Sequence, residues 1–221
     1  MVSNDRIDAG QAVYTPLTLW LYDWFVLGFS NSMLWRCPSA QLRAMYDRNV
    51  SSNHLDIGVG TGYFLDHAQW PVEKPDIMLV DLNSHSLAAA SSRIARYAPR
   101  TLNTDVFKPL PFERAFDSVG VCYLLHCLPG DMIQKCAIFD NIVPAMREGA
   151  RVFGATILQG DAPRSRPAQW LMSFYNRKGV FSNAADTIAD LGDELESRFS
   201  NVSITRHGAV AIFEARVAHA S

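Results

Sequence analysis

The chain has 221 residues, enough to bury one sizeable hydrophobic core, and its composition indicates neither a second domain nor a disordered tail. It carries 20 basic and 22 acidic residues, a formal net charge of −2, which argues against a basic surface for nucleic acid or an anionic membrane. The four cysteines form no CxxC pair, so neither a disulfide framework nor a metal site is expected.

The first 50 residues are rich in aromatic side chains. They begin without the basic start and apolar run of a secretory signal. The most apolar stretch, Leu17 to Phe29, is interrupted by Asp23 and is shorter than the ~20 apolar residues of a membrane-spanning helix. We therefore expect a cytoplasmic protein with no membrane partner, in which this segment packs over the folded core as a helical cap.

Residues 54–154 alternate short apolar runs with segments of helical spacing, a pattern typical of parallel strands joined by crossover helices. Strands are predicted at 54–58, 77–81, 101–105, 116–122 and 150–156. Helices are predicted at 62–69, 84–98, 131–146 and 168–175, with Asn83 and Asp131 as start signals for two of them.

The C-terminal part predicts a turn at 176–179, where Arg177 and Lys178 are expected in solvent, and then a helix at 183–198. Strands follow at 202–206 and 209–215, and the short link His207-Gly208 predicts an antiparallel hairpin. The predicted fold is therefore α/β: a Rossmann-like, seven-stranded, mostly parallel sheet with a C-terminal antiparallel hairpin and helices on both faces.

A glycine-rich loop, Asp56-Ile57-Gly58-Val59-Gly60-Thr61-Gly62, lies between the first predicted strand and helix. Glycines let the backbone approach a ligand, and the following helix start offers free N–H groups. The GxGxG spacing with bulky Tyr63 and Phe64 after it favours a nucleotide cofactor without a diphosphate. Asp81 ends the next strand, where its carboxylate can hold two ribose hydroxyls.

This loop, Asp81, the step at 104–106 and the segment 116–119 together resemble class I S-adenosylmethionine-dependent methyltransferases over about residues 50 to 160. The resemblance implies S-adenosylmethionine as cofactor and S-adenosylhomocysteine as product, with Asp81 on the ribose, Asp105 on the adenine amino group and Cys122 beside the methionine portion. Within the family the chain looks like the small stand-alone enzymes of natural-product pathways. The expected cofactor-binding residues are Asp56, Gly58, Gly60, Gly62, Asp81, Leu82, Asp105, Val106 and Cys122.

On this reading the whole chain, 1–221, is a single methyltransferase domain. Residues 1–50 form an aromatic cap or lid, and 51–160 form the cofactor-binding core. Residues 161–200 form a substrate-side insertion and helix, and 201–221 form the terminal hairpin. No metal is expected.

Methyl transfer is an in-line displacement at a sulfonium, so alignment and exclusion of water matter more than catalytic side chains. A hydroxyl acceptor gains from a general base, and His126, in the loop that leaves the fourth strand, is the candidate. Its flanking leucines equally allow a buried structural histidine. Tyr123 is the second catalytic candidate, as a group that orients the acceptor or the sulfonium.

Tyr14 and Tyr22 are the expected substrate-binding residues. Aromatic residues at 170, 174, 175 and 181, together with Asn183, form the other side of an expected apolar lid, although plain core packing is the simpler interpretation of such spacing. The acceptor is expected to be a small, largely apolar molecule, such as a polyketide-like secondary metabolite, methylated at oxygen, carbon or nitrogen.

The fourth strand ends in Val121-Cys122-Tyr123-Leu124 rather than the Asn-Pro-Pro-Tyr type of quartet found in enzymes that methylate nucleobases, so no nucleic-acid partner is expected. Two alternatives remain open. One is a methyltransferase-like protein that catalyses a cyclisation or isomerisation without transferring methyl. The other is a non-catalytic partner subunit of a synthase, with the apolar first 50 residues as its interface.

Overall fold

The computed structural model describes residues 34–160 and 166–218. The expected substrate residues Tyr14 and Tyr22, and the cap up to residue 33, lie outside the described residues. The predicted packing of the N-terminal segment over the sheet can be followed only from Leu34 onward.

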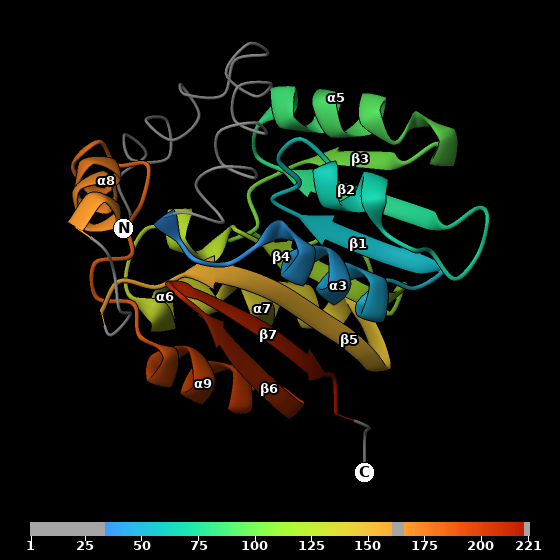
Figure 1. The fold of residues 1–221 in the computed structure, drawn as a ribbon. Helices are drawn as coiled ribbons and strands as arrows, with labels where there is room; N and C mark the ends of the chain where they lie inside the picture. The colour runs from blue at the N-terminus through green and yellow to red at the C-terminus, as the bar shows by residue number, and fades with distance from the viewer. Residues whose placement is uncertain (1–33, 161–165, 219–221) are drawn as a thin grey trace.

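Within the described residues the strands form one seven-stranded sheet in the order β3-β2-β1-β4-β5-β7-β6 (Figure 1). The strands are β1 Asn53–Ile57, β2 Asp76–Asp81, β3 Arg100–Asn103, β4 Phe116–Cys122, β5 Met146–Ile157, β6 Ser200–His207 and β7 Val210–Arg216. β1 to β5 pair in parallel, while β7 is antiparallel to both β5 and β6. This confirms the predicted α/β fold and its terminal hairpin.

Helices cover both faces of the sheet, with α3 in front of it and α7 behind β5 in Figure 1. The described α-helices are α3 Ser39–Asn49, α4 Tyr63–His67, α5 Ser84–Arg93, α6 Met132–Cys136, α7 Ile138–Ile142, α8 Arg166–Arg177 and α9 Ile188–Glu196. The predicted start signals are confirmed: Asn83 caps α5, and Asp131 forms a capping box with Gln134.

Three helix predictions were wrong in extent. The predicted helix 84–98 ends at Arg93, and the 3-10 turn Ala95–Tyr97 follows it. The predicted helix 131–146 is broken at Ala137 into α6 and α7. It ends in the 3-10 turn Val143–Ala145, where Pro144 brings no N–H to an α-helical ladder, and Met146 already begins β5. The predicted helix 183–198 starts later, at Ile188, because the Thr187 side chain caps it by accepting from the Asp190 N–H.

The N-terminal segment joins the core through a close backbone contact. Ala209 N–H donates to the Trp35 carbonyl at 2.9 Å, and a Cβ on Gly208 would stand 2.2 Å from the same oxygen. Only glycine therefore fits the hairpin turn, whose φ is also positive at +60°. Trp35 is buried, and α3 follows with Leu42 and Met45 fully buried against the sheet.

Among the described residues, no helix is long and apolar enough to cross a membrane. The same part of the chain holds no group of three or more His, Cys, Asp or Glu side chains arranged to bind a metal ion.

Candidate functional site

A cavity of about 790 Å³ opens where the carboxyl ends of β1, β2 and β4 meet the loops that follow them. In open α/β sheets this edge is where ligands bind. The predicted cofactor-binding residues all line this cavity: Asp56, Gly58, Gly60, Gly62, Asp81, Leu82, Asp105, Val106 and Cys122. The fold therefore brings together positions that span 67 residues of sequence, from 56 to 122.

The three glycines of the loop all have positive φ but serve different contacts. A Cβ on Gly62 would lie 2.9 Å from the Ala90 backbone, so the absence of a side chain here lets α5 pack close to the loop. A Cβ on Gly58 would lie 3.0 Å from the Leu124 side chain. A Cβ on Gly60, by contrast, would meet nothing within 4 Å. Gly60 therefore keeps open the space in which a cofactor can lie against the backbone, as the glycine-loop prediction requires.

Asp81 stands at the end of β2 on the cavity wall, half-buried. Its Oδ1 accepts a hydrogen bond from the Asn83 N–H at 2.8 Å. Burial raises the pKa of this carboxyl from 3.8 to about 6, although the Asn83, Gly60 and Val59 backbone groups favour the ionised form. Ribose hydroxyls would supply the further donors that a half-desolvated carboxylate lacks.

Asp105 also lines the cavity, but one of its oxygens is used within its own loop: Oδ1 accepts from the Phe107 N–H at 3.0 Å. This is the turn-acceptor role common for aspartate after a strand. The other oxygen has no hydrogen bond within the described part of the chain, so the expected adenine contact stays a prediction that the geometry allows.

Asp56 is nearly fully buried beneath the glycine loop. Its Oδ2 accepts a hydrogen bond from the Tyr46 hydroxyl at 3.0 Å and lies 3.3 Å from His54 Nε2. Burial first, and then the nearby Asp56 charge, raise the pKa of Tyr46 well above 10. Sequence reasoning missed Tyr46 and His54, because nothing in their spacing marks the contact from α3 or the orientation on β1.

The two catalytic candidates lie in different surroundings. Tyr123 lines the cavity and has a left-handed backbone, with φ +59°, directly after β4. His126 is 2% exposed, is not among the cavity-lining residues, and its Nδ1 accepts from the Ile157 N–H at 3.4 Å. Burial, and secondarily Lys135, lower the pKa of His126 to about 3.

These surroundings do not suit His126 for the predicted role of general base. A base must reach the acceptor hydroxyl and have a pKa near the working pH, and His126 has neither property in this structure. We therefore revise its expected role to a structural one. Tyr123 remains the better placed of the two candidates, and its role stays a prediction.

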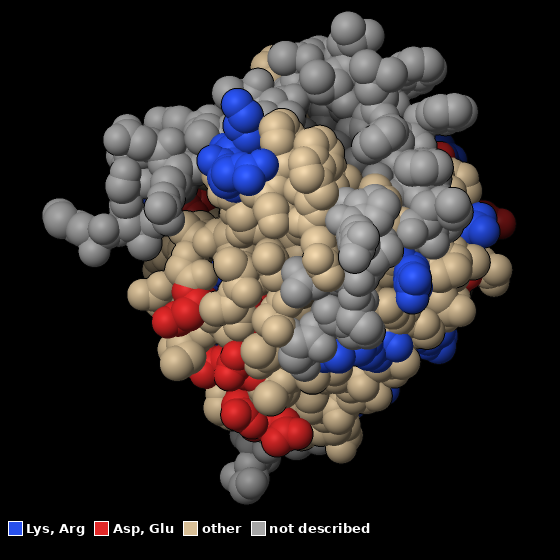
Figure 2. Space-filling view, turned by 60° about the vertical axis from the view of Figure 1, so that its left-hand side comes forward, with Lys and Arg blue, Asp and Glu red and all other residues tan. Residues whose placement is uncertain are grey.

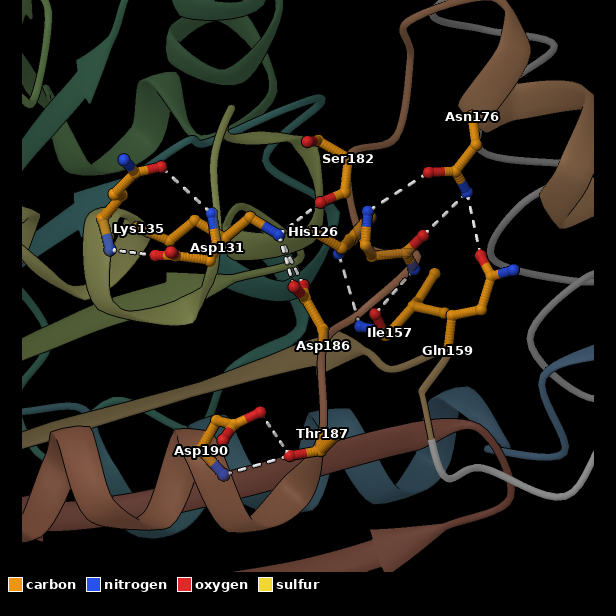
Figure 3. A network of polar contacts seen from close by, with 12 residues as sticks. His126, Asp131, Lys135, Ile157, Gln159, Asn176, Ser182, Asp186, Thr187 and Asp190 are labelled. Carbon is orange, nitrogen blue, oxygen red and sulfur yellow. Dashed lines mark hydrogen bonds and ion pairs between the residues drawn. The ribbon is translucent and has the colours of Figure 1, made fainter.

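The segment 178–186, which follows α8, forms one wall of the cavity, and a buried polar network holds this wall in place (Figure 3). Lys135 Nζ, fully buried on α6, lies 2.6 Å from Asp186 Oδ2 and donates to the Ser182 carbonyl at 2.6 Å. The Ser182 N–H donates to the His126 carbonyl at 2.9 Å. The wall is thus tied both to α6 and to the loop after β4.

The predicted lid residues lie in different surroundings. Phe181 lines the cavity and packs edge-on against the His126 ring at 4.6 Å, while Trp170 on α8 is 65% exposed. Asn183 is fully buried and donates to the Ile157 carbonyl at 2.8 Å, so it anchors the wall rather than facing a substrate. Lys178, expected in solvent, is exposed and also lines the cavity rim.

Comparison with known proteins agrees with this geometry. A family described as a methyltransferase domain matches residues 55–152. Over 216 residues, 97% of this chain and 94% of the relative, the sequence is 44% identical to demethylluteothin O-methyltransferase of Streptomyces thioluteus. The chain belongs to the class I S-adenosylmethionine-dependent methyltransferases.

Further relatives of this methyltransferase agree in sequence and in fold. The physcion biosynthesis cluster O-methyltransferase of Aspergillus chevalieri is 36% identical over 211 residues, 94% of this chain and 95% of that protein. Among solved structures, the DhpI–SAH complex superposes with a TM-score of 0.71 at 15% identity, covering 99% of this chain and all of that one, 100%. At that identity the match speaks for the fold alone.

Proposed function

We propose that this methyltransferase transfers the methyl group of S-adenosylmethionine to an oxygen atom of a small, largely apolar acceptor, a secondary metabolite. One observation supports the proposal: the same cavity is lined by Asp81, Asp105, the glycine loop, Tyr123 and Phe181. It therefore offers both acidic groups for a nucleoside and aromatic surface for an acceptor.

The choice of oxygen rests on the relatives, two of which are named O-methyltransferases at 44% and 36% identity. The charge distribution supports a small acceptor rather than a polyanion. On the face shown in Figure 2 the described surface is mainly uncharged, and acidic and basic side chains gather in separate small groups. The names of these relatives also favour methyl transfer over the non-methylating and partner-subunit alternatives.

The chain's own residues have limited chemical tasks in this proposal. S-adenosylmethionine supplies the electrophilic methyl group when bound. Asp81 accepts from the ribose hydroxyls, Asp56 faces the amino-acid end, and Gly60 leaves room for the ligand against the backbone. Tyr123 and Phe181 flank the acceptor and exclude water, which raises the effective concentration of the aligned nucleophile.

The test begins with calorimetric titration of the purified protein with S-adenosylmethionine, S-adenosylhomocysteine and NADH. Micromolar binding of the first two ligands without the third is expected. An acceptor screen with mass-spectrometric detection follows, in which hydroxylated aromatic and polyketide-like compounds should gain one methyl group. Absence of binding by both sulfur ligands would refute the proposal, whereas methylation at nitrogen or carbon alone would refute the oxygen assignment.

A further inference from the structure

The buried histidine of β1 is a polar residue in an apolar setting. His54 is 0% exposed, stacks on Phe153 with ring centroids 5.7 Å apart, and meets the edge of Trp70 at 5.5 Å. An apolar ring would satisfy this packing. What such a ring would lose is the pair of nitrogen contacts, because a buried polar group is costly unless it is hydrogen-bonded.

The two nitrogen contacts point along the sheet to different partners. Nδ1 lies 2.8 Å from Ser118 Oγ on β4, and Nε2 lies 3.3 Å from Asp56 Oδ2. Because His54 and Asp56 are two residues apart on one strand, their side chains share a face of the sheet. His54 thus lies between the Ser118 hydroxyl on one side and the Asp56 carboxylate, which lines the cavity, on the other.

One tautomer of the histidine satisfies both contacts. Either serine hydroxyl can donate in the 2.7 Å contact between Ser51 Oγ and Ser118 Oγ, so Ser51 can donate there and leave the Ser118 hydrogen for His54 Nδ1. The ring hydrogen then lies on Nε2, which donates to Asp56 Oδ2.

The neighbouring strand β4 also leaves space for the Asp56 carboxylate. Asp56 pairs in register with Gly120 of β4, and a Cβ on Gly120 would stand 2.6 Å from Asp56 Oδ2. Together with the Tyr46 hydroxyl, His54 occupies Oδ2, while no hydrogen bond within the described residues uses Oδ1. Oδ1 is thus the oxygen left for a ligand in the cavity that Asp56 lines.

We infer that His54 is a positioning residue: by holding Oδ2 of Asp56 it directs Oδ1 toward the α-ammonium group at the amino-acid end of S-adenosylmethionine. This inference rests on the proposed function. It assigns to His54 a selective effect, on ligands that carry the amino-acid portion and not on those that carry the nucleoside alone.

The experiment compares the binding of S-adenosylhomocysteine with that of 5′-methylthioadenosine, which lacks the amino-acid portion, by calorimetry. His54→Met removes both nitrogens at similar length and in a side chain that packs adaptably, whereas His54→Gln keeps an N–H donor near the Nε2 position. Thr156→Val is the matched control: Thr156 is also fully buried and polar, and its Oγ1 has no hydrogen-bond partner among the described residues.

His54→Met should weaken S-adenosylhomocysteine binding at least about 10-fold and leave 5′-methylthioadenosine within about 2-fold, as the loss of a charge-assisted contact predicts. His54→Gln should recover most of that loss, and Thr156→Val should change neither affinity. Equal weakening of both ligands, or of neither, would overturn the inference. So would equal losses in the Gln and Met variants.

Circular dichroism checks that each variant is folded. If His54→Met does not fold, His54→Phe replaces it, since a six-membered ring suits the space between Phe153 and Trp70. Failure of the wild-type protein to bind S-adenosylhomocysteine refutes the proposed function itself, and the inference with it. Wild-type binding with unchanged ligand preference in the His54 variants refutes only the inference.

Discussion

The raised pKa of Asp81 predicts that cofactor affinity depends on pH in a range where S-adenosylhomocysteine itself does not titrate. Ribose hydroxyls donate to the ionised carboxylate, so binding requires Asp81 to lose its proton. With a pKa of about 6, the carboxylate is mostly ionised at pH 7 and mostly protonated at pH 5. The affinity for S-adenosylhomocysteine should therefore fall about tenfold between these two values.

Calorimetry in buffers of different ionisation enthalpy measures this effect directly, because binding near pH 6 should release a proton. Asp81→Asn is the control variant: it should bind about 100-fold more weakly at pH 7 and show no dependence on pH between 5 and 7. A wild-type affinity that stays constant from pH 7 to pH 5, or a pH dependence that persists in Asp81→Asn, would refute the reasoning.

The same carboxyl affects the stability of the ligand-free protein. The folded chain keeps the Asp81 proton up to about pH 6, whereas the unfolded chain loses it near 3.8. Stability therefore falls as the pH rises through this window, by at most about 3 kcal/mol, less the part that solvent in the cavity screens. Ligand binding relieves this cost, so the increase in melting temperature that S-adenosylhomocysteine produces should be larger at pH 7 than at pH 5.

Three further predictions concern packing and buried charge. In Gly62→Ala the new Cβ meets the Ala90 backbone, so the free energy of unfolding should fall by about 2 kcal/mol or more. Gly60→Ala should lower it by only about 1 kcal/mol but should weaken cofactor binding. Urea titration measures the stability and calorimetry the binding, and equal stability losses in the two variants would contradict the assignment. Asp186→Leu should cost about 3–5 kcal/mol by leaving Lys135 buried without its partner, and the double variant with Lys135→Met should regain most of it in urea unfolding. His126 takes up a proton in the unfolded chain near pH 6.5 but in the folded chain only near pH 3, so the free energy of unfolding should fall by up to about 5 kcal/mol between these values. His126→Gln should make the free energy of unfolding less dependent on pH in this range. An unchanged acid transition in this variant would argue against the burial of His126.

Much of the fold could be predicted because its signals are local. The strand predicted at 116–122 begins and ends at the same residues as β4, because its apolar run is bounded by polar or small residues. The caps at Asn83 and Asp131 were predicted because capping depends on side chains only a few residues apart. The break at Ala137 within 131–146 was missed because the helical spacing continues through it in sequence.

The candidate site divides in the same way. The glycine loop and Asp81 were found because a motif of fixed spacing marks them, and the structure places them on one cavity. The partner of His126 is the backbone of Ile157, 31 residues away on β5, and no local sequence pattern indicates that the ring already accepts a hydrogen bond. The Lys135–Asp186 pair joins residues 51 positions apart and was invisible for the same reason.

The order of strands at one edge of the sheet has a consequence for the newly made chain. β7 lies between β5 and β6, so β5 and β6 share no hydrogen bonds and meet only through a strand that follows both in sequence. Until residues 210–216 leave the ribosome, residues 151–157 of β5 present an open edge of unpaired backbone N–H and C=O groups, a template for pairing with another chain. A ribosome stalled shortly before this strand would thus display an aggregation-prone intermediate whose glycine loop and Asp81 have already been synthesised.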